Sequence, residues 1–170
     1  MGDIFHSYPA ISDLQRMHPE SELTWLVDSG FEKIAGWHPF VKEVVPIPLR
    51  KMKKEGRKKH LPGVRAALNK IRLSKFDFII DAQGLIKSAW LASRVKGQIH
   101  GYSWRSAREP LASLFYSNTH FISKDVHAVE RIRMLFASAL GYSSVGLDYQ
   151  GIKNLHWQKP KDQLAGYGLV

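Results

Sequence analysis

The sequence predicts an α/β domain in which a mostly parallel sheet is covered by helices on both faces. Short apolar runs that suit buried strands alternate along the chain with longer segments whose apolar residues recur at helical spacing. Polar loops follow several of these runs, as is typical of the loops that connect a parallel strand to the next helix. The 170 residues, of which 44% are hydrophobic, are enough to bury one core.

The first helix is expected directly behind Asp3. Ser7 is a good N-cap and Pro9 is tolerated in a first helical turn. Apolar residues then recur on one face, at Tyr8, Ile11, Leu14 and Met17. A loop-to-helix junction of this kind normally follows a strand, so we expect the chain to lack a strand in front of Met1.

The next segments predict a strand, a helix and a second strand. Residues 23–27 read as a short buried strand, and a helix through Phe31 and Trp37 ends at His38-Pro39. Residues 43–49 are strand-like, but Pro46 and Pro48 remove two backbone donors. That strand is therefore expected at a sheet edge, or to end early.

The second half of the chain continues the alternation. A helix is expected over residues 63–73, and residues 76–80 form the clearest central strand. This strand leads into the turn Asp81-Ala82-Gln83-Gly84, and a helix with Leu85, Ser88, Ala89 and Ala92 comes next.

Three further elements complete the pattern. They are a strand at residues 99–102, a short helix through Leu111 and Phe115, and a long helix that Asp125 can cap and Gly141 can stop. Residues 1–150 are predicted to form one domain. From residue 151 to residue 170 the pattern decays, which predicts a linker to a further domain.

The positive charge is concentrated in one segment. The chain carries a net charge of +10, and residues 50–59 hold seven cations against Glu55. The segment is either a solvated loop or a binding site for an anionic partner such as nucleic acid, a lipid surface or a phosphorylated molecule. No aromatic side chain stands between Arg50 and His60 to stack on bases, which disfavours nucleic acid.

Several classes of site are not predicted. The chain has no cysteine, and its eight histidines stand singly without the paired spacing of metal ligands. It also lacks the glycine motifs that cradle phosphates or dinucleotides. We therefore expect no metal and no cofactor. No apolar run approaches the length of a membrane span.

Three polar features are predicted to meet at the carboxyl edge of the sheet: Asp3, the Asp81-Ala82-Gln83-Gly84 turn and the loop at residues 104–110. Asp3 is either a helix cap or a base that accepts a proton from a substrate hydroxyl. For Asp81 the favoured interpretation is a turn held by backbone hydrogen bonds. Arg108 either pairs with Glu109 or grips a phosphate.

Four strings of the sequence together resemble one family. They are Met1-Gly2-Asp3-Ile4-Phe5-His6-Ser7-Tyr8-Pro9-Ala10, Asp81-Ala82-Gln83-Gly84-Leu85-Ile86-Lys87-Ser88-Ala89, Ala107-Arg108-Glu109-Pro110-Leu111-Ala112-Ser113-Leu114-Phe115-Tyr116 and His127-Ala128-Val129-Glu130-Arg131. In order and spacing they resemble the N-terminal half of the bacterial lipopolysaccharide heptosyltransferase I family, which belongs to glycosyltransferase family 9. The resemblance runs from residue 1 to about residue 150.

The resemblance implies a Rossmann-like domain of a two-domain GT-B enzyme and an inverting reaction. Heptose would pass from ADP-L-glycero-D-manno-heptose to Kdo2-lipid A at the cytoplasmic face of the bacterial inner membrane. The donor would bind mainly to a C-terminal domain that this chain does not contain. The chain would thus supply the acceptor-binding half and be inactive by itself.

The resemblance also implies roles for individual residues. Asp3 falls on the family's proposed catalytic base. The acceptor-binding positions are Arg50, Lys51, Lys53, Lys54 and Arg108. His6, Gln83 and Gly84 lie in the matching strings and are expected to shape the site. Some family arginines are lysines here, and a lysine offers a point charge without a bidentate fork.

The chief alternative is a basic α/β module that binds nucleic acid or an anionic membrane without catalysis. It rests on the charge of residues 50–59 alone.

Overall fold

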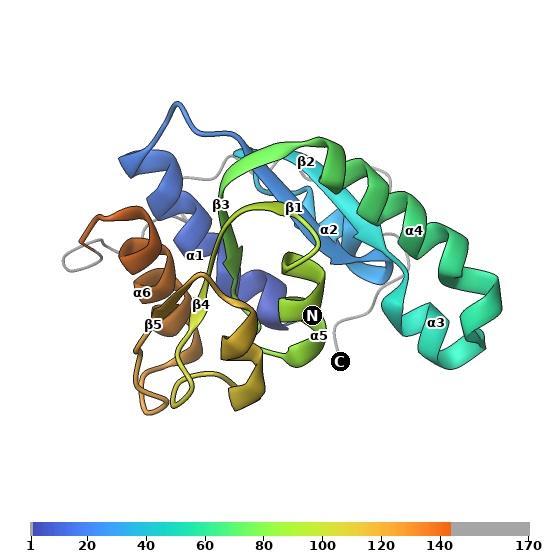
Figure 1. Ribbon diagram of the computed structural model, residues 1–170. Helices are drawn as coiled ribbons and strands as arrows, with labels where there is room; N and C mark the ends of the chain where they lie inside the picture. The colour runs from blue at the N-terminus through green and yellow to red at the C-terminus, as the bar shows by residue number, and fades with distance from the viewer. Residues whose placement is uncertain (1, 144–170) are drawn as a thin grey trace, which may run out of the picture.

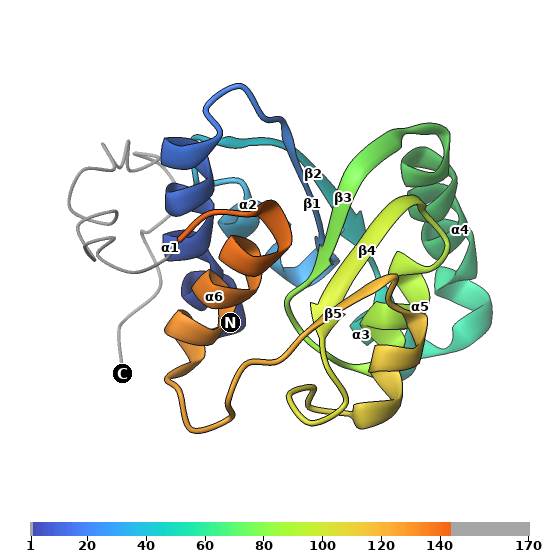
Figure 2. The same ribbon diagram turned by 60° about the vertical axis from the view of Figure 1, so that its left-hand side comes forward.

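Parallel strands in two sheets lie between two layers of helices in the computed structural model, which describes residues 2–143 (Figures 1 and 2). One sheet pairs β1 (Leu23–Asp28) with β2 (Val41–Ile47). The other has the order β3 (Lys75–Asp81), β4 (Lys96–Tyr102) and β5 (Asn118–His120). Every strand pair within these residues is parallel, which confirms the predicted α/β class.

The helices divide between the two faces, as Figure 2 shows. On one side lie α1 (Gly2–Met17), α2 (Glu32–Ala35) with its preceding 3-10 turn η1 (Ser29–Phe31), and α6 (Ala128–Leu140). On the other lie α3 (Leu49–Glu55), α4 (Arg57–Leu73), α5 (Ile86–Ala92) and the 3-10 helix η2 (Pro110–Phe115).

Apolar clusters join each layer to the strands. On one face Tyr8 and Ile11 of α1 pack with Val27 of β1. On the other, Val45 of β2 packs with Val64 of α4. These buried contacts, which remove apolar area from water, fix the helices against the neighbouring strands.

The two sheets do not pair with each other. A space of about 1330 Å³, which we call the central cleft, separates β1 from β3 and is lined by residues of both strands. Residues 76–80 were predicted as the central strand, and that prediction is wrong for the described chain. In the described sheet β3 pairs on one side with β4, and Phe78 is 47% exposed on the strand beside the cleft.

The first helix begins earlier than the sequence predicted. Gly2 already has helical structure, so Ser7 is not the N-cap and Pro9 lies inside α1. An interior proline removes a helical hydrogen bond and costs about 3 kcal/mol or more. Burial of the α1 face that contains Ile4 and Tyr8 offsets that cost.

The basic segment is helical, not a loop. It forms α3 and the start of α4, which begins at Arg57 instead of residue 63. Leu49 and Met52 lie three residues apart and pack against the core of β2 and α4. This contact gives the segment one apolar side, which is what a short helix needs to be stable.

The predicted edge strand and helix ends have different outcomes. Strand β2 contains Pro46, ends at Ile47 before Pro48, and pairs only with β1 among the described strands, as predicted for an edge. The cap of α6 is His127, whose Nδ1 accepts from the Val129 amide, so the prediction of Asp125 is wrong. Asp125 instead closes a local turn with Ser123, while Gly141 ends the helix in the left-handed region as predicted. The predicted linker at residues 151–170 lies outside the described residues.

Candidate active site

Most of the predicted site residues line the central cleft. Asp3, His6, Arg50, Gln83 and Arg108 are all among its lining residues. They come from α1, α3, the turn after β3 and the loop before η2, segments far apart in the sequence. The structure therefore brings together the residues that were predicted to meet at the carboxyl edge of the sheet.

Asp3 contacts Arg108 directly. Its Oδ1 lies 3.2 Å from Nη2 of Arg108, and both side chains are more than half exposed. The carboxylate is thus accessible, and one of its oxygens is oriented by a guanidinium. Glu109, which was the predicted alternative partner of Arg108, is engaged elsewhere: its Oε2 accepts from the Ile86 amide at 2.6 Å.

Asp81 holds the turn that follows β3, as predicted. Its Oδ1 accepts from the amides of Gln83 and Gly84 at 2.9 and 3.3 Å. Its Oδ2 accepts from the hydroxyls of Ser88 at 2.8 Å and Tyr116 at 2.7 Å. Burial raises the pKa of the Asp81 carboxyl, while these four hydrogen bonds act in the opposite direction.

Gly84 is required by the geometry of this turn. Its φ of +64° lies in the left-handed region, and a Cβ there would stand 3.1 Å from Tyr102 and 3.3 Å from the backbone nitrogen of Arg108. Its carbonyl accepts from the Glu109 amide at 3.0 Å. Gly84 therefore lets the loop with Arg108 approach closely, and this places Arg108 beside Asp3.

Arg50 is held at the end of β1. Its amide donates to Oδ2 of Asp28 at 2.9 Å, and its guanidinium lies 4.6 Å from the centre of the Phe31 ring. The stacking restricts the side chain while it leaves the planar fork free to bind an anion.

The three lysines of α3 are exposed and stand next to Arg50. Within residues 2–143, Lys51, Lys53 and Lys54 have no ion pair, and they are not among the residues that line the central cleft. Glu55 pairs with Lys59 and His60, whose hydrogen bonds lower its pKa to about 2. The lysines thus form a solvated cationic rim beside the cleft.

His6 lies one turn after Asp3 on α1. Its ring meets that of His127 edge to face, with the ring centres 6.2 Å apart. Its side chain lines the central cleft, and its predicted role in shaping the site stays a prediction.

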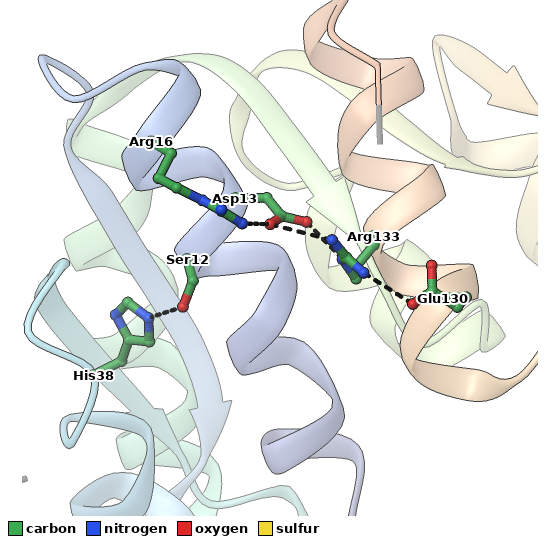
Figure 3. A network of polar contacts seen from close by, with 6 residues as sticks. All are labelled: Ser12, Asp13, Arg16, His38, Glu130 and Arg133. Carbon is green, nitrogen blue, oxygen red and sulfur yellow. Dashed lines mark hydrogen bonds and ion pairs between the residues drawn. The ribbon is translucent and has the colours of Figure 1, made fainter. Parts of the chain in front are cut away.

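A buried polar network fixes α1, and with it Asp3, against α6 (Figure 3). Nε of Arg133 lies 2.6 Å from Oδ2 of Asp13, and both side chains are almost fully buried. Asp13 also accepts from Arg16 at 2.6 Å, and Arg133 reaches Glu130 at 2.9 Å. On the other side of α1, Ser12 and His38 lie within hydrogen-bond distance of each other, 3.0 Å apart.

Sequence reasoning missed four contributors to the site. Asp28 holds Arg50, Ser88 and Tyr116 hold Asp81, and Lys87 lines the cleft. Ser88, Lys87 and Tyr116 lie within the quoted strings, but nothing in the local pattern marks them as partners of Asp81 or of the cleft. Asp28 had a usable signal, because it is an acid directly behind a predicted strand.

Residues 2–143 contain no cluster of three histidine or acidic side chains that could hold a metal ion. None of the helices that they form combines the length and the apolar content needed to cross a bilayer.

Known proteins with the same sequence pattern decide the family. The sequence model of glycosyltransferase family 9 (heptosyltransferase) matches residues 64–166, more than half of the chain. The chain belongs to glycosyltransferase family 9. Lipopolysaccharide heptosyltransferase 1 of Escherichia coli K12 is 45% identical over 145 residues, which are 84% of this chain and 46% of the relative. The enzyme of the same name from Pseudomonas aeruginosa is 42% identical over 88% of this chain and 43% of the relative.

Solved structures of the family have the same fold. The E. coli heptosyltransferase WaaC with ADP matches 84% of this chain and 45% of its own, with a TM-score of 0.79 and 43% identity. WaaC with ADP-2-deoxy-2-fluoro heptose matches 90% and 50%, with a TM-score of 0.80 and 42% identity. The family 9 member described here spans about half the length of these relatives.

Proposed function

We propose that the chain is the acceptor-binding half of an inverting heptosyltransferase, with Asp3 as the catalytic base. The intact enzyme would transfer L-glycero-D-manno-heptose from ADP-heptose to Kdo2-lipid A in the synthesis of the lipopolysaccharide inner core. The observation that carries the proposal is the Asp3–Arg108 pair, at 3.2 Å, on the wall of a cleft that Arg50 also lines.

The arrangement suits a single displacement. Asp3 would accept the proton of an acceptor hydroxyl as its oxygen bonds to the anomeric carbon of the heptose, and the bond to ADP would break on the opposite face. That route inverts the anomeric centre, and the proton ends on the carboxylate. The exposed carboxylate has room for the hydroxyl, since Arg108 engages only one of its oxygens at 3.2 Å.

The cations would bind the acceptor. Kdo2-lipid A carries carboxylates and phosphates, which guanidinium groups bind through paired hydrogen bonds. Arg108 and Arg50 are placed for this role in the cleft, and Lys51, Lys53 and Lys54 extend the positive surface along α3. His6, Gln83 and Gly84 would shape the cleft around the acceptor sugar.

The proposed domain boundary follows from the same assignment. Residues 1–150 would form the acceptor domain and residues 151–170 the link to a donor domain that binds ADP-heptose. In the longer protein a further parallel strand would fill the part of the central cleft between the bodies of β1 and β3, and the acceptor would occupy the part at the carboxyl ends of the strands, where Asp3, Arg50 and Arg108 lie. The support for this strand is the pair of facing strand edges, since an open edge is a template for pairing.

The enzyme would act at the cytoplasmic face of the inner membrane, without a metal or a cofactor.

Binding of Kdo2-lipid A in detergent micelles tests the acceptor role. The chain should bind micelles that contain Kdo2-lipid A more tightly than plain micelles, and Arg108→Ala should lose about tenfold in affinity. Arg72→Ala, at the far end of α4, is the matched control and should bind as the unchanged chain does. Equal losses in both variants would mean that only overall charge matters.

The alternative of a nucleic-acid module receives no support from the relatives described above, which are named as heptosyltransferases. An oligonucleotide added to the same assay should compete weakly, and its competition should vanish with salt.

A further inference from the structure

Two short helices beside the site expose a group of large apolar side chains. Helix α5 and the 3-10 helix η2 pack side by side through small residues, with Ala89 and Ala92 of α5 buried against Ala112 and Tyr116. Their outer surfaces carry Ile86 (38% exposed), Trp90 (40%), Leu111 (50%) and Leu114 (73%), which we call the apolar patch.

The side chains of the apolar patch are held in fixed positions by the two helices. Ile86 and Trp90 are four residues apart on an α-helix, and Leu111 and Leu114 are three apart on a 3-10 helix, so each pair shares one helical face. The Glu109 carboxylate, which accepts from the Ile86 amide at 2.6 Å, ties the start of η2 to the start of α5. Both pairs of apolar side chains are therefore held on helices that pack against each other.

The segment that carries the patch is positively charged. From residue 82 to residue 124 the chain has six cations, Lys87, Arg94, Lys96, Arg105, Arg108 and Lys124, of which Arg108 is paired with Asp3. Glu109 is the only acid in that range, and its carboxylate already serves the Ile86 amide. The guanidinium of Arg94 lies 4.6 Å from the centre of the Trp90 ring. Apolar groups interleaved with cations are the composition that inserts into a bilayer interface and attracts anionic headgroups.

The patch adjoins the candidate active site. Gly84 lies two residues before the start of α5, and Arg108 lies two residues before the start of η2. Helix α3, with its exposed lysines, lies at the same edge of the molecule as α5 (Figures 1 and 2). A flat surface in contact with the patch would therefore lie close to the Arg108 side of the cleft.

We propose that the apolar patch is the surface by which this protein docks on an anionic lipid bilayer, with its side chains in the interface and the surrounding cations on the headgroups. This inference rests on the proposed function in one respect, because a lipid acceptor explains why the docking surface adjoins the cleft. Docked in this way, the cleft would receive the sugars of a lipid whose acyl chains stay in the bilayer.

Sedimentation with vesicles tests the proposal. The chain should sediment with vesicles of phosphatidylethanolamine and phosphatidylglycerol, and less with phosphatidylcholine alone. Leu111→Ser with Leu114→Ser should weaken binding to the anionic vesicles about tenfold or more, because both leucines lose their place in the interface. These leucines are exposed, so the variant should fold, which circular dichroism checks.

A matched control separates the patch from general hydrophobicity. Leu73 is 88% exposed at the end of α4, before β3 begins, and Leu73→Ser should leave vesicle binding unchanged. High salt should weaken the chain's binding, but the apolar contribution should persist, so a difference between the two variants should remain.

The outcomes distinguish the two proposals. If the Leu111→Ser, Leu114→Ser variant binds vesicles as well as the Leu73→Ser variant, the docking surface is wrong and the patch serves a protein interface. These vesicles contain no Kdo2-lipid A, so that result would leave the acceptor role intact. If the chain binds the vesicles as expected but does not recognise Kdo2-lipid A, the proposed function is wrong and the docking surface is supported.

Discussion

The carboxylate of Asp3 and the guanidinium of Arg108 meet at 3.2 Å although 105 residues separate them in the chain. Both side chains are more than half exposed, so the pair adds about 0–1 kcal/mol at most to stability. Its consequence is geometric: it joins the first turn of α1 to the loop before η2 and places an acid beside an anion-binding side chain. Four predictions follow from this arrangement and from the contacts that maintain it.

Asp3→Asn should abolish transfer while acceptor binding survives. The amide keeps the size of the side chain but cannot take a proton from the acceptor hydroxyl, so the rate should fall about 10²–10⁴-fold. The measurement is heptose transfer by the full-length enzyme that contains this segment. Asp125→Asn, at an exposed acid that does not line the central cleft, is the control and should keep its rate. A normal rate in the Asp3 variant would remove Asp3 from catalysis.

Gly84→Ala should destabilise the fold and weaken acceptor binding together. The left-handed backbone and the approach to Tyr102 and Arg108 leave no space for a Cβ. We expect a loss of about 1–3 kcal/mol in urea unfolding. Gly141→Ala shares the positive φ but meets nothing within 4 Å, so it should lose only about 1 kcal/mol and keep acceptor binding. Equal effects of the two changes would argue against the close approach.

His38 should make stability depend on pH. Burial lowers the pKa of the His38 ring to about 4, below the ordinary value of about 6.5. The Phe40 amide donates to Nδ1, which leaves the proton on Nε2 to donate to the Ser12 hydroxyl. The neutral ring is thus the form that fits. Its contribution is fully present above pH of about 6.5 and is lost as pH falls towards about 4.

The loss attributable to His38 should reach about 3 kcal/mol. Urea unfolding at neutral pH and near pH 4 would measure it, with His38→Gln as the variant that cannot titrate. That variant should be less stable than the unchanged chain at neutral pH, with the gap closing in acid. A gap that stays constant with pH would contradict the buried neutral ring.

Arg133→Met should be more damaging than the loss of the whole pair. Removing the guanidinium leaves the buried Asp13 with Arg16 as its remaining partner, at an expected cost of about 3–5 kcal/mol. In the double variant Asp13→Leu, Arg133→Met, neither buried charge of this pair remains. Its free energy of unfolding should therefore fall by less than that of the single variant. If the double variant were the less stable one, the network of Figure 3 would contribute more than its desolvation costs.

Much of the fold could be predicted because its signals are local. The apolar run at residues 23–27 became β1, and the helix stop at Gly141 adopts the left-handed conformation that glycine favours. The candidate site was anticipated through the carboxyl ends of strands, where Asp81 holds its turn as expected. What failed was decided by distant contacts: Pro9 lies inside a helix because the face around it is buried, and the basic segment is helical because Leu49 and Met52 reach the core.

By itself the sequence determined most of the order of strands and helices, though not α3 or β5, together with the cationic segment and the four strings that point to a glycosyltransferase. These depend on residue type and spacing within a few positions, where propensity and periodicity act. Only the tertiary structure decided that Arg108 meets Asp3 and not Glu109, that Gly84 admits the loop with Arg108, and that β3 borders a cleft. The reason is physical: those relationships depend on packing between segments brought together by burial of apolar surface, and no local pattern encodes which segments will meet.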